Sequence, residues 1–155
     1  MSNSSYRPGY QSGTATIEFA VALPLLLAVL MATAEFGRML SQYDTLNKAV
    51  RDGARYLAAN ALAAGGTTGV ITITPAVTTA TKNLVVKGNT TGAGNALLPS
   101  FTAGNVTVTN LGNGYVSVSA AYPYVPMLGA SLPTFGSGSV NTAITLNATT
   151  VMRPL

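Results

Sequence analysis

The chain of 155 residues has room for one modest domain, and any residues spent on a membrane helix are lost to the core of that domain. Hydrophobic residues make up 48% of the chain and charged residues only 8%, which is far from the composition of a disordered tail. The net charge of +4 is spread thinly, without a dense cluster of Lys and Arg, so the sequence predicts no nucleic-acid partner.

The residue types that are missing exclude most catalytic chemistry. The chain has no Cys and no His, which removes the thiolate nucleophile, the usual general base and the commonest zinc and copper ligands. All four acids, Glu18, Glu35, Asp44 and Asp52, lie in the first third, so residues 61–155 cannot supply a catalytic carboxylate pair. A Ser/Lys pair remains formally possible, but no pairing stands out. We therefore expect no catalytic residues, no metal site, no cofactor and no enzymatic activity.

The first third of the chain predicts a polar leader followed by one long helix. Residues 1–13 are polar, contain Pro and Gly, and show no apolar period. Residues 14–60 are compatible with a helix, and within them residues 17–34 are almost entirely apolar on every side. Eighteen residues are at the short end of the roughly 17 to 25 that span a bilayer. The pattern favours lipid or a packed filament interior, with the core helix of a soluble domain as the alternative.

Residues 35–60 change to an amphipathic pattern. Apolar residues recur at steps of three and four, which keeps them on one side of a helix. This stripe consists of Phe36, Met39, Tyr43, Leu46, Val50, Gly53 and Leu57. It can pack against the head of the same chain or against a neighbouring helix. Both kinds of packing can occur at different positions along the helix. Asp44, Lys48 and Asp52 follow at i, i+4 on other sides and predict a solvated surface.

Residues 61–155 predict a small head. The paired glycines Gly65 and Gly66 end the long helix. Thr74 and Pro75 provide an N-cap and a first helical position, and apolar spacing continues to Gly88, which predicts a second, short helix. A strand at residues 84–86 is the alternative, because β-branched residues dominate there.

The rest of the head predicts an antiparallel sheet. Residues 106–109 and 115–119 alternate on either side of the turn at 112–114 and predict a hairpin. A Pro- and Gly-rich stretch at 123–138 precedes a third strand expected at 140–152. The predicted fold is therefore α+β, with a long N-terminal helix followed by a small head of one short helix and an antiparallel sheet.

The N-terminal region resembles a known family. The run Gly13-Thr14-Ala15-Thr16-Ile17-Glu18-Phe19 is similar to the cleavage region of type IV prepilins. With Leu23-Pro24-Leu25, residues 35–38 and residues 49–56, it resembles the TadE-like minor pilins of tight-adherence systems. Residues 13–57 carry the strong part of this resemblance, and the head carries a weaker part at residues 84–89 and 148–153.

The resemblance implies that a prepilin peptidase cuts after Gly13 and leaves Thr14 as the new N-terminal residue. A glycine offers that peptidase no side chain to clash with. Glu18, Phe19 and Pro24 are then the assembly and processing motif. A carboxylate in an apolar segment costs roughly 2–3 kcal/mol, so Glu18 needs a partner. The resemblance implies the N-terminal amine of a neighbouring subunit; the alternative is an ordinary helix-start acid favoured by the dipole. Pro24 either shapes assembly or is tolerated, as Pro often is in membrane helices.

The expected function is a structural subunit of a tight-adherence or type IV-like pilus for surface attachment. It would be a single-pass protein of the bacterial inner membrane with its head outside the cytoplasm, and later part of the cell-surface pilus. The implied partners are prepilin peptidase, inner-membrane assembly machinery and other pilin subunits, in a homo- or hetero-oligomer joined through the N-terminal helix. The positive-inside rule disagrees with this orientation, because basic residues after the apolar segment outnumber Arg7.

An ordinary signal peptide is the alternative. Arg7, the apolar run and Ala32-Thr33-Ala34 reproduce the three regions of a signal peptidase substrate, with cleavage near Ala34. The product would be a secreted soluble binding protein. A membrane-anchored adhesin that does not polymerise is the third possibility.

Overall fold

A computed structural model describes residues 12–61, 71–127, 129, 131–133 and 138–154 of the chain. These residues belong to two compact units that divide between Gly37 and Arg38. The first unit contributes only helix. The second contains the rest of that helix together with the head.

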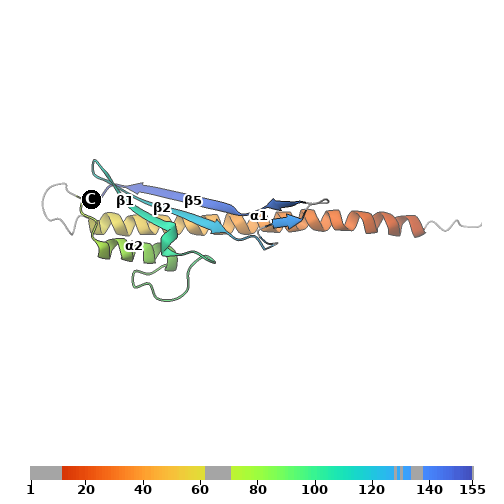
Figure 1. Ribbon diagram of the computed structural model, residues 1–155, viewed down its shortest axis with the longest axis horizontal. Helices are drawn as coiled ribbons and strands as arrows, with labels where there is room; N and C mark the ends of the chain where they lie inside the picture. Colours follow the sequence, from red (N-terminus) through yellow and green to blue (C-terminus); the bar gives the residue numbers. More distant parts are fainter. Residues whose placement is uncertain (1–11, 62–70, 128, 130, 134–137, 155) are drawn as a thin grey trace, which may run out of the picture. The chain divides into compact units, whose positions relative to one another are not determined.

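Helix α1, Ser12–Ala61, contains 50 residues and includes Pro24 in its interior (Figure 1). Proline removes one backbone N–H donor, so the carbonyl of Ala20, four residues earlier, loses its usual helical partner. Most of the expected leader and the expected helix end at Gly65 and Gly66 lie outside the described residues.

Helix α2, Pro75–Lys87, has both of the caps that its sequence predicts. The Thr74 hydroxyl accepts a hydrogen bond from the Val77 N–H at 3.3 Å, and Pro75 takes the first helical position. At the other end Gly88 adopts a left-handed conformation, with φ of +73°, and its N–H donates to the Leu84 carbonyl at 2.9 Å. Residues 84–86 are therefore helical, and the alternative of a strand there is wrong.

The head sheet has three antiparallel strands in the order β1-β2-β5. These are β1 Val106–Gly112, β2 Tyr115–Tyr124 and β5 Ile144–Met152, and the short 3-10 helix η1, Ala103–Asn105, precedes β1 (Figure 1). Asn113 and Gly114, with φ of 51° and 81°, connect β1 to β2. Positive φ at both central residues is the type I′ geometry that Asn-Gly prefers, so the hairpin forms where the sequence predicts it.

The expected third strand at 140–152 is wrong in its first part. Strand β5 begins at Ile144, and β4, Ser139–Asn141, instead pairs with β3, Ser131–Pro133, in a separate two-stranded sheet. The reason is that Tyr124, the last residue of β2, pairs with Ile144. Residues before Ile144 have no remaining β2 residue to pair with, and β3 provides their partner.

Strand β2 also continues further than expected, through Pro123. Pairing with β1 ends at Ala120, whereas pairing with β5 continues to Tyr124. One side of β2 therefore has no strand to pair with at Pro123. This is the setting in which a sheet tolerates a residue without an N–H.

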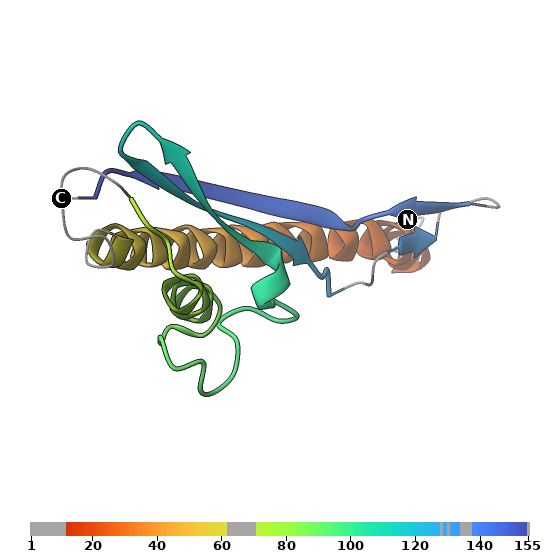
Figure 2. The same ribbon diagram turned by 60° about the vertical axis from the view of Figure 1, so that its left-hand side comes forward.

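The core of the second unit lies between α1, α2 and the sheet. Alternate residues of β2 point inward, from Val116 through Val118, Ala120 and Tyr122 to Tyr124. They meet buried residues of α1 and α2 in one cluster, and the sheet and α2 lie on different sides of α1 in both views (Figures 1 and 2). The α+β fold predicted from the sequence, a long N-terminal helix, a short helix and an antiparallel sheet, is confirmed.

Candidate assembly segment

The Gly13–Thr14 bond lies in the first turn of α1. A Cβ built on Gly13 would meet no atom within 4 Å, so a substituted residue has open space around it. A peptidase that requires an extended chain would have to open this turn.

Glu18 is the seventh residue of α1, and the first turn of that helix contains no acid. The helix dipole acts mainly within the first turn, so this position weakens the dipole explanation of the carboxylate. Glu18 is exposed, and within the part of the chain that the structure describes it has no ion-pair partner. Thr14 lies one turn earlier, about 6 Å along the axis and on the same side of the helix. The carboxylate is thus placed where a partner from outside the chain can reach it.

The apolar segment around Glu18 has an exposed surface. Exposure of its large side chains ranges from 38% for Leu23 to 74% for Val21, with Phe19 at 61%. The helix is long and apolar enough to cross a membrane, and its most hydrophobic window is 0% buried. Residues 17–34 extend for about 27 Å along a helix, close to the roughly 30 Å of a bilayer's hydrocarbon core. Nothing in the described chain covers this surface, as a soluble core would.

The apolar stripe of residues 36–57 divides into two parts. Leu46, Val50 and Leu57 are fully buried in the head core, and Gly53 is buried with them. Met39 is half-buried and packs against the same core. By contrast, Phe36 is 57% exposed and Tyr43 is 40% exposed. The part of the stripe from Leu46 to Leu57 therefore packs into the head core. The part before it leaves the apolar side chains of Phe36 and Tyr43 exposed.

Gly53 is a close-contact position. A Cβ built on it would overlap Cγ2 of Val85 and would lie 3.6 Å from Cγ2 of Thr81. Both neighbours belong to α2, so the missing side chain lets the two helices approach each other. The sequence pattern placed Gly53 in the apolar stripe but did not identify α2 as the helix that packs on it. The available signal was a glycine at a position of the stripe otherwise occupied by large apolar residues.

Two aromatic residues near the end of β2 connect the sheet to α1. The Tyr122 hydroxyl donates to Oε1 of Gln42 at 3.0 Å, and its ring meets Phe101 edge to face at 5.6 Å. The Arg38 guanidinium lies 5.8 Å from the ring centre of Tyr124. Burial raises the pKa of Tyr122 above its ordinary value of 10.0, and the charge of Arg38 opposes this. None of these contacts was predicted, since two of them join residues 80 and 86 positions apart and the third joins Phe101 to Tyr122 across a loop and a strand.

The charged residues of α1 from Asp44 to Arg55 face solvent. Lys48 pairs with Asp44 at 2.6 Å, and Arg55 lies 3.9 Å from Asp52, with all four side chains more than half exposed. Such pairs contribute little to stability. Among the described residues no group of three or more His, Cys, Asp or Glu could hold a metal ion. Helix α1 therefore offers surfaces for helix packing, together with the carboxylate of Glu18 in an apolar surface.

A comparison with protein families identifies the same region. Residues 13–55 match the family model of TadE-like proteins, so the match starts at Gly13, ends inside α1, and leaves the head outside. Searches of curated proteins and of solved structures find no match. The resemblance of residues 13–55 to TadE-like proteins, a family of pilin-like components of tight-adherence pilus systems, is therefore confirmed.

Proposed function

We propose that this chain is a prepilin-like structural subunit of a tight-adherence or type IV-like pilus. In this proposal a prepilin peptidase removes residues 1–13. Residues 17–34 then hold the subunit in the bacterial inner membrane, with the head outside the cytoplasm. Assembly machinery later moves the subunit into a surface filament, where α1 packs against other pilin subunits. The proposed role is structural and involves no catalysis or cofactor.

The observation that carries the proposal is the change of environment along α1. Its first part exposes an apolar surface on every side, and its part from Leu46 to Ala61 buries a single stripe in the head. A subunit that leaves a bilayer for a filament interior needs such a segment, because both surroundings are apolar. A soluble domain gains nothing from it.

The alternative signal-peptide site lies inside this helix. Residues 32–34 are helical, and the Thr33 hydroxyl donates to the carbonyl of Val29 at 2.9 Å. Cleavage there would separate the apolar part of α1 from the stripe. The TadE-like match, which covers both parts, supports keeping them together.

Glu18 provides the test of assembly. If the carboxylate pairs with the N-terminal amine of a neighbouring subunit, Glu18→Ala removes a charge that is costly in lipid. We expect normal leader removal and membrane insertion, with surface filaments reduced to a small fraction. Glu18→Gln is the matched control for shape, and we expect it to fail in the same way because it lacks the charge.

The readout is leader cleavage by immunoblot and filament counts by electron microscopy in the same strains. Normal filament numbers in the Glu18→Ala strain would contradict the pairing. Filaments with Glu18→Gln but not with Glu18→Ala would assign Glu18 a hydrogen-bonding role in place of an ionic one.

A further inference from the structure

The head sheet has two open edges. Within the described residues, β1 and β5 each pair with β2 alone (Figure 2). An edge strand presents unpaired N–H and C=O groups, and the ligand that matches such a row is another extended backbone. The question for each edge is therefore which strand it receives.

Charged residues and proline, two of the usual protections against pairing, are absent from both edge strands. Strand β5 is nine residues long and contains no charged residue and no proline. Strand β1 also has neither, although the Asn110 side chain bonds the Ile71 carbonyl at 3.1 Å and a register shift follows at Gly112. The regular, open part of β1 is thus residues 106–109. Proteins that stay monomeric commonly protect such edges with Lys, Pro or a bulge.

The directions of the strands restrict what can pair. Both β1 and β5 run antiparallel to β2, so they run parallel to each other. Antiparallel pairing of two β5 edges would point residues 38–61 of α1, which belong to the same compact unit as the sheet, in opposite directions in the two copies. Copies inserted in one membrane share one direction, so their edges can meet only in parallel. Two identical edges cannot pair symmetrically in parallel. In a parallel pair of strands, one of two opposing residues forms both hydrogen bonds to the neighbouring strand and the other forms none at that position.

We propose that β5 of one copy pairs in parallel with β1 of the next copy, which joins the heads into a continuous sheet. This inference rests on the proposed function, since it uses the common direction of anchored subunits. The contact joins two different surfaces, so it repeats without closing and suits an open filament. The outward side chains beside the seam are uncharged, and basic heads therefore meet there without repulsion. These side chains are Thr107, Thr109, Thr145, Asn147 and Thr149.

Cysteine cross-linking of the full-length chain tests the seam, because the natural sequence has no Cys. One cysteine replaces Thr107 or Thr109 in β1, and a second replaces Thr145, Asn147 or Thr149 in β5. All five positions are exposed and lie on one side of the sheet. Within one chain β2 separates the two strands, so the two positions are at least about 9.5 Å apart, the value for Thr107 and Thr149, which both lie opposite Ser119. A disulfide requires Cα atoms within about 7 Å, which excludes a bond inside one copy.

Membrane and sheared-filament fractions are oxidised mildly and separated without reductant. We expect at least one of the six pairs to give a ladder of oligomers that collapses on reduction. Each single variant, and Thr149→Cys combined with Thr79→Cys on the exposed side of α2, should give no ladder. The pair that cross-links identifies the register.

Dimers from a single β5 cysteine would overturn the proposal in favour of β5 pairing with itself. Absence of any ladder, with filaments present and the leader removed, would overturn the edge pairing and leave the pilin function standing. If the chain without any substitution neither loses its leader nor forms filaments, both the proposed function and this inference are wrong.

Discussion

The two parts of α1 differ in what covers them. The apolar segment before Gly37 exposes large side chains on every side, whereas the helix from Leu46 to Leu57 buries one stripe and exposes its charges. Both parts are helical for different reasons. An all-round apolar helix is stable where its surroundings are apolar, and an amphipathic one is stable where a core receives one face. Hydrophobicity alone therefore does not identify the core of this protein, but its distribution around the helix does.

The largest expected effect comes from Gly13, which belongs to the first part. We expect Gly13→Leu to block leader removal almost completely, because the substituted side chain clashes in the peptidase and meets nothing in the chain itself. Gly37→Ala is the matched control, since a Cβ there also meets no atom within 4 Å. Immunoblots should show uncut precursor for Gly13→Leu and normal processing for Gly37→Ala. Normal processing of both would remove Gly13 from the cleavage site.

Gly53 tests the second part. We expect Gly53→Ala to destabilise the head by about 1–3 kcal/mol, because Val85 must move to admit the methyl group. Gly37→Ala should instead stabilise the helix by about 0.5–1 kcal/mol. Denaturant unfolding of the purified full-length chain in detergent measures both changes. If Val85→Ala restores part of the stability lost in Gly53→Ala, the contact between α1 and α2 causes that loss. Equal changes in unfolding free energy for Gly37→Ala and Gly53→Ala would show that this contact is not the cause.

Much of this fold is local and was predictable. The caps of α2 need only Thr74, Pro75 and Gly88, and the hairpin turn needs only Asn113 and Gly114. The apolar segment and its motif were likewise readable from neighbouring residues. The close contact of Gly53 and the bond between Tyr122 and Gln42 were not readable, because each depends on which distant segment packs opposite. The break between β4 and β5 was missed for the same reason.

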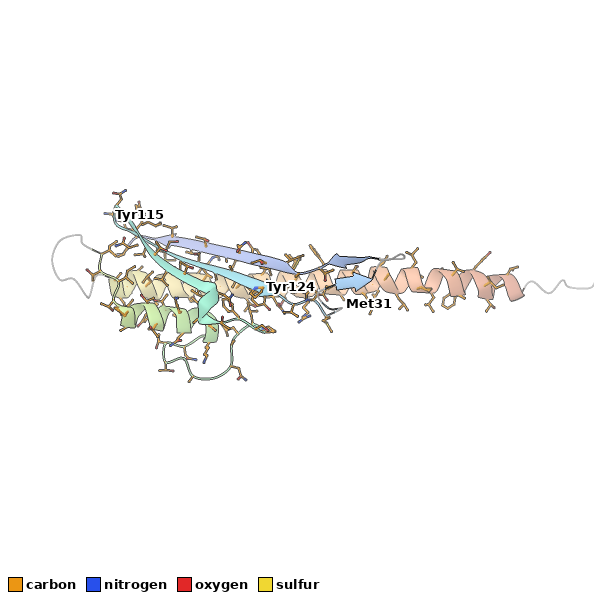
Figure 3. The ribbon with its side chains drawn as sticks, viewed as in Figure 1. Met31, Tyr115 and Tyr124 are labelled. Carbon is orange, nitrogen blue, oxygen red and sulfur yellow. The ribbon has the colours of Figure 1, made fainter. Side chains whose placement is uncertain are left out.

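Tyr122 gives the smallest effect, at the junction of the sheet and α1. Figure 3 shows Tyr115 and Tyr124 at opposite ends of β2, so Tyr122 lies close to the Tyr124 end. Tyr122→Phe removes the bond to Gln42 and should cost about 1 kcal/mol at neutral pH. Tyr115→Phe, at a side chain that is 44% exposed, should change stability by less than about 0.5 kcal/mol.

The pH dependence gives a second readout for Tyr122. Burial raises its pKa above the ordinary 10.0, so the unfolded chain loses this proton at lower pH than the folded chain does. The contribution of the protonated Tyr122 hydroxyl to the free energy of unfolding is complete below pH 10.0 and is lost as the pH rises through the folded pKa. Thermal unfolding between pH 9 and 11 should therefore show a shallower decline for Tyr122→Phe than for the natural chain. Identical slopes would contradict this assignment.

The most direct test of the account is the N-terminus of the protein taken from its native cell, measured by intact mass and N-terminal sequencing. The prepilin interpretation predicts a mature chain that begins at Thr14 and keeps the whole apolar part of α1. A chain that begins at Glu35 would show that a signal peptidase removes that part. The exposed apolar helix would then be a discarded export signal, and the assembly role proposed for it would be wrong.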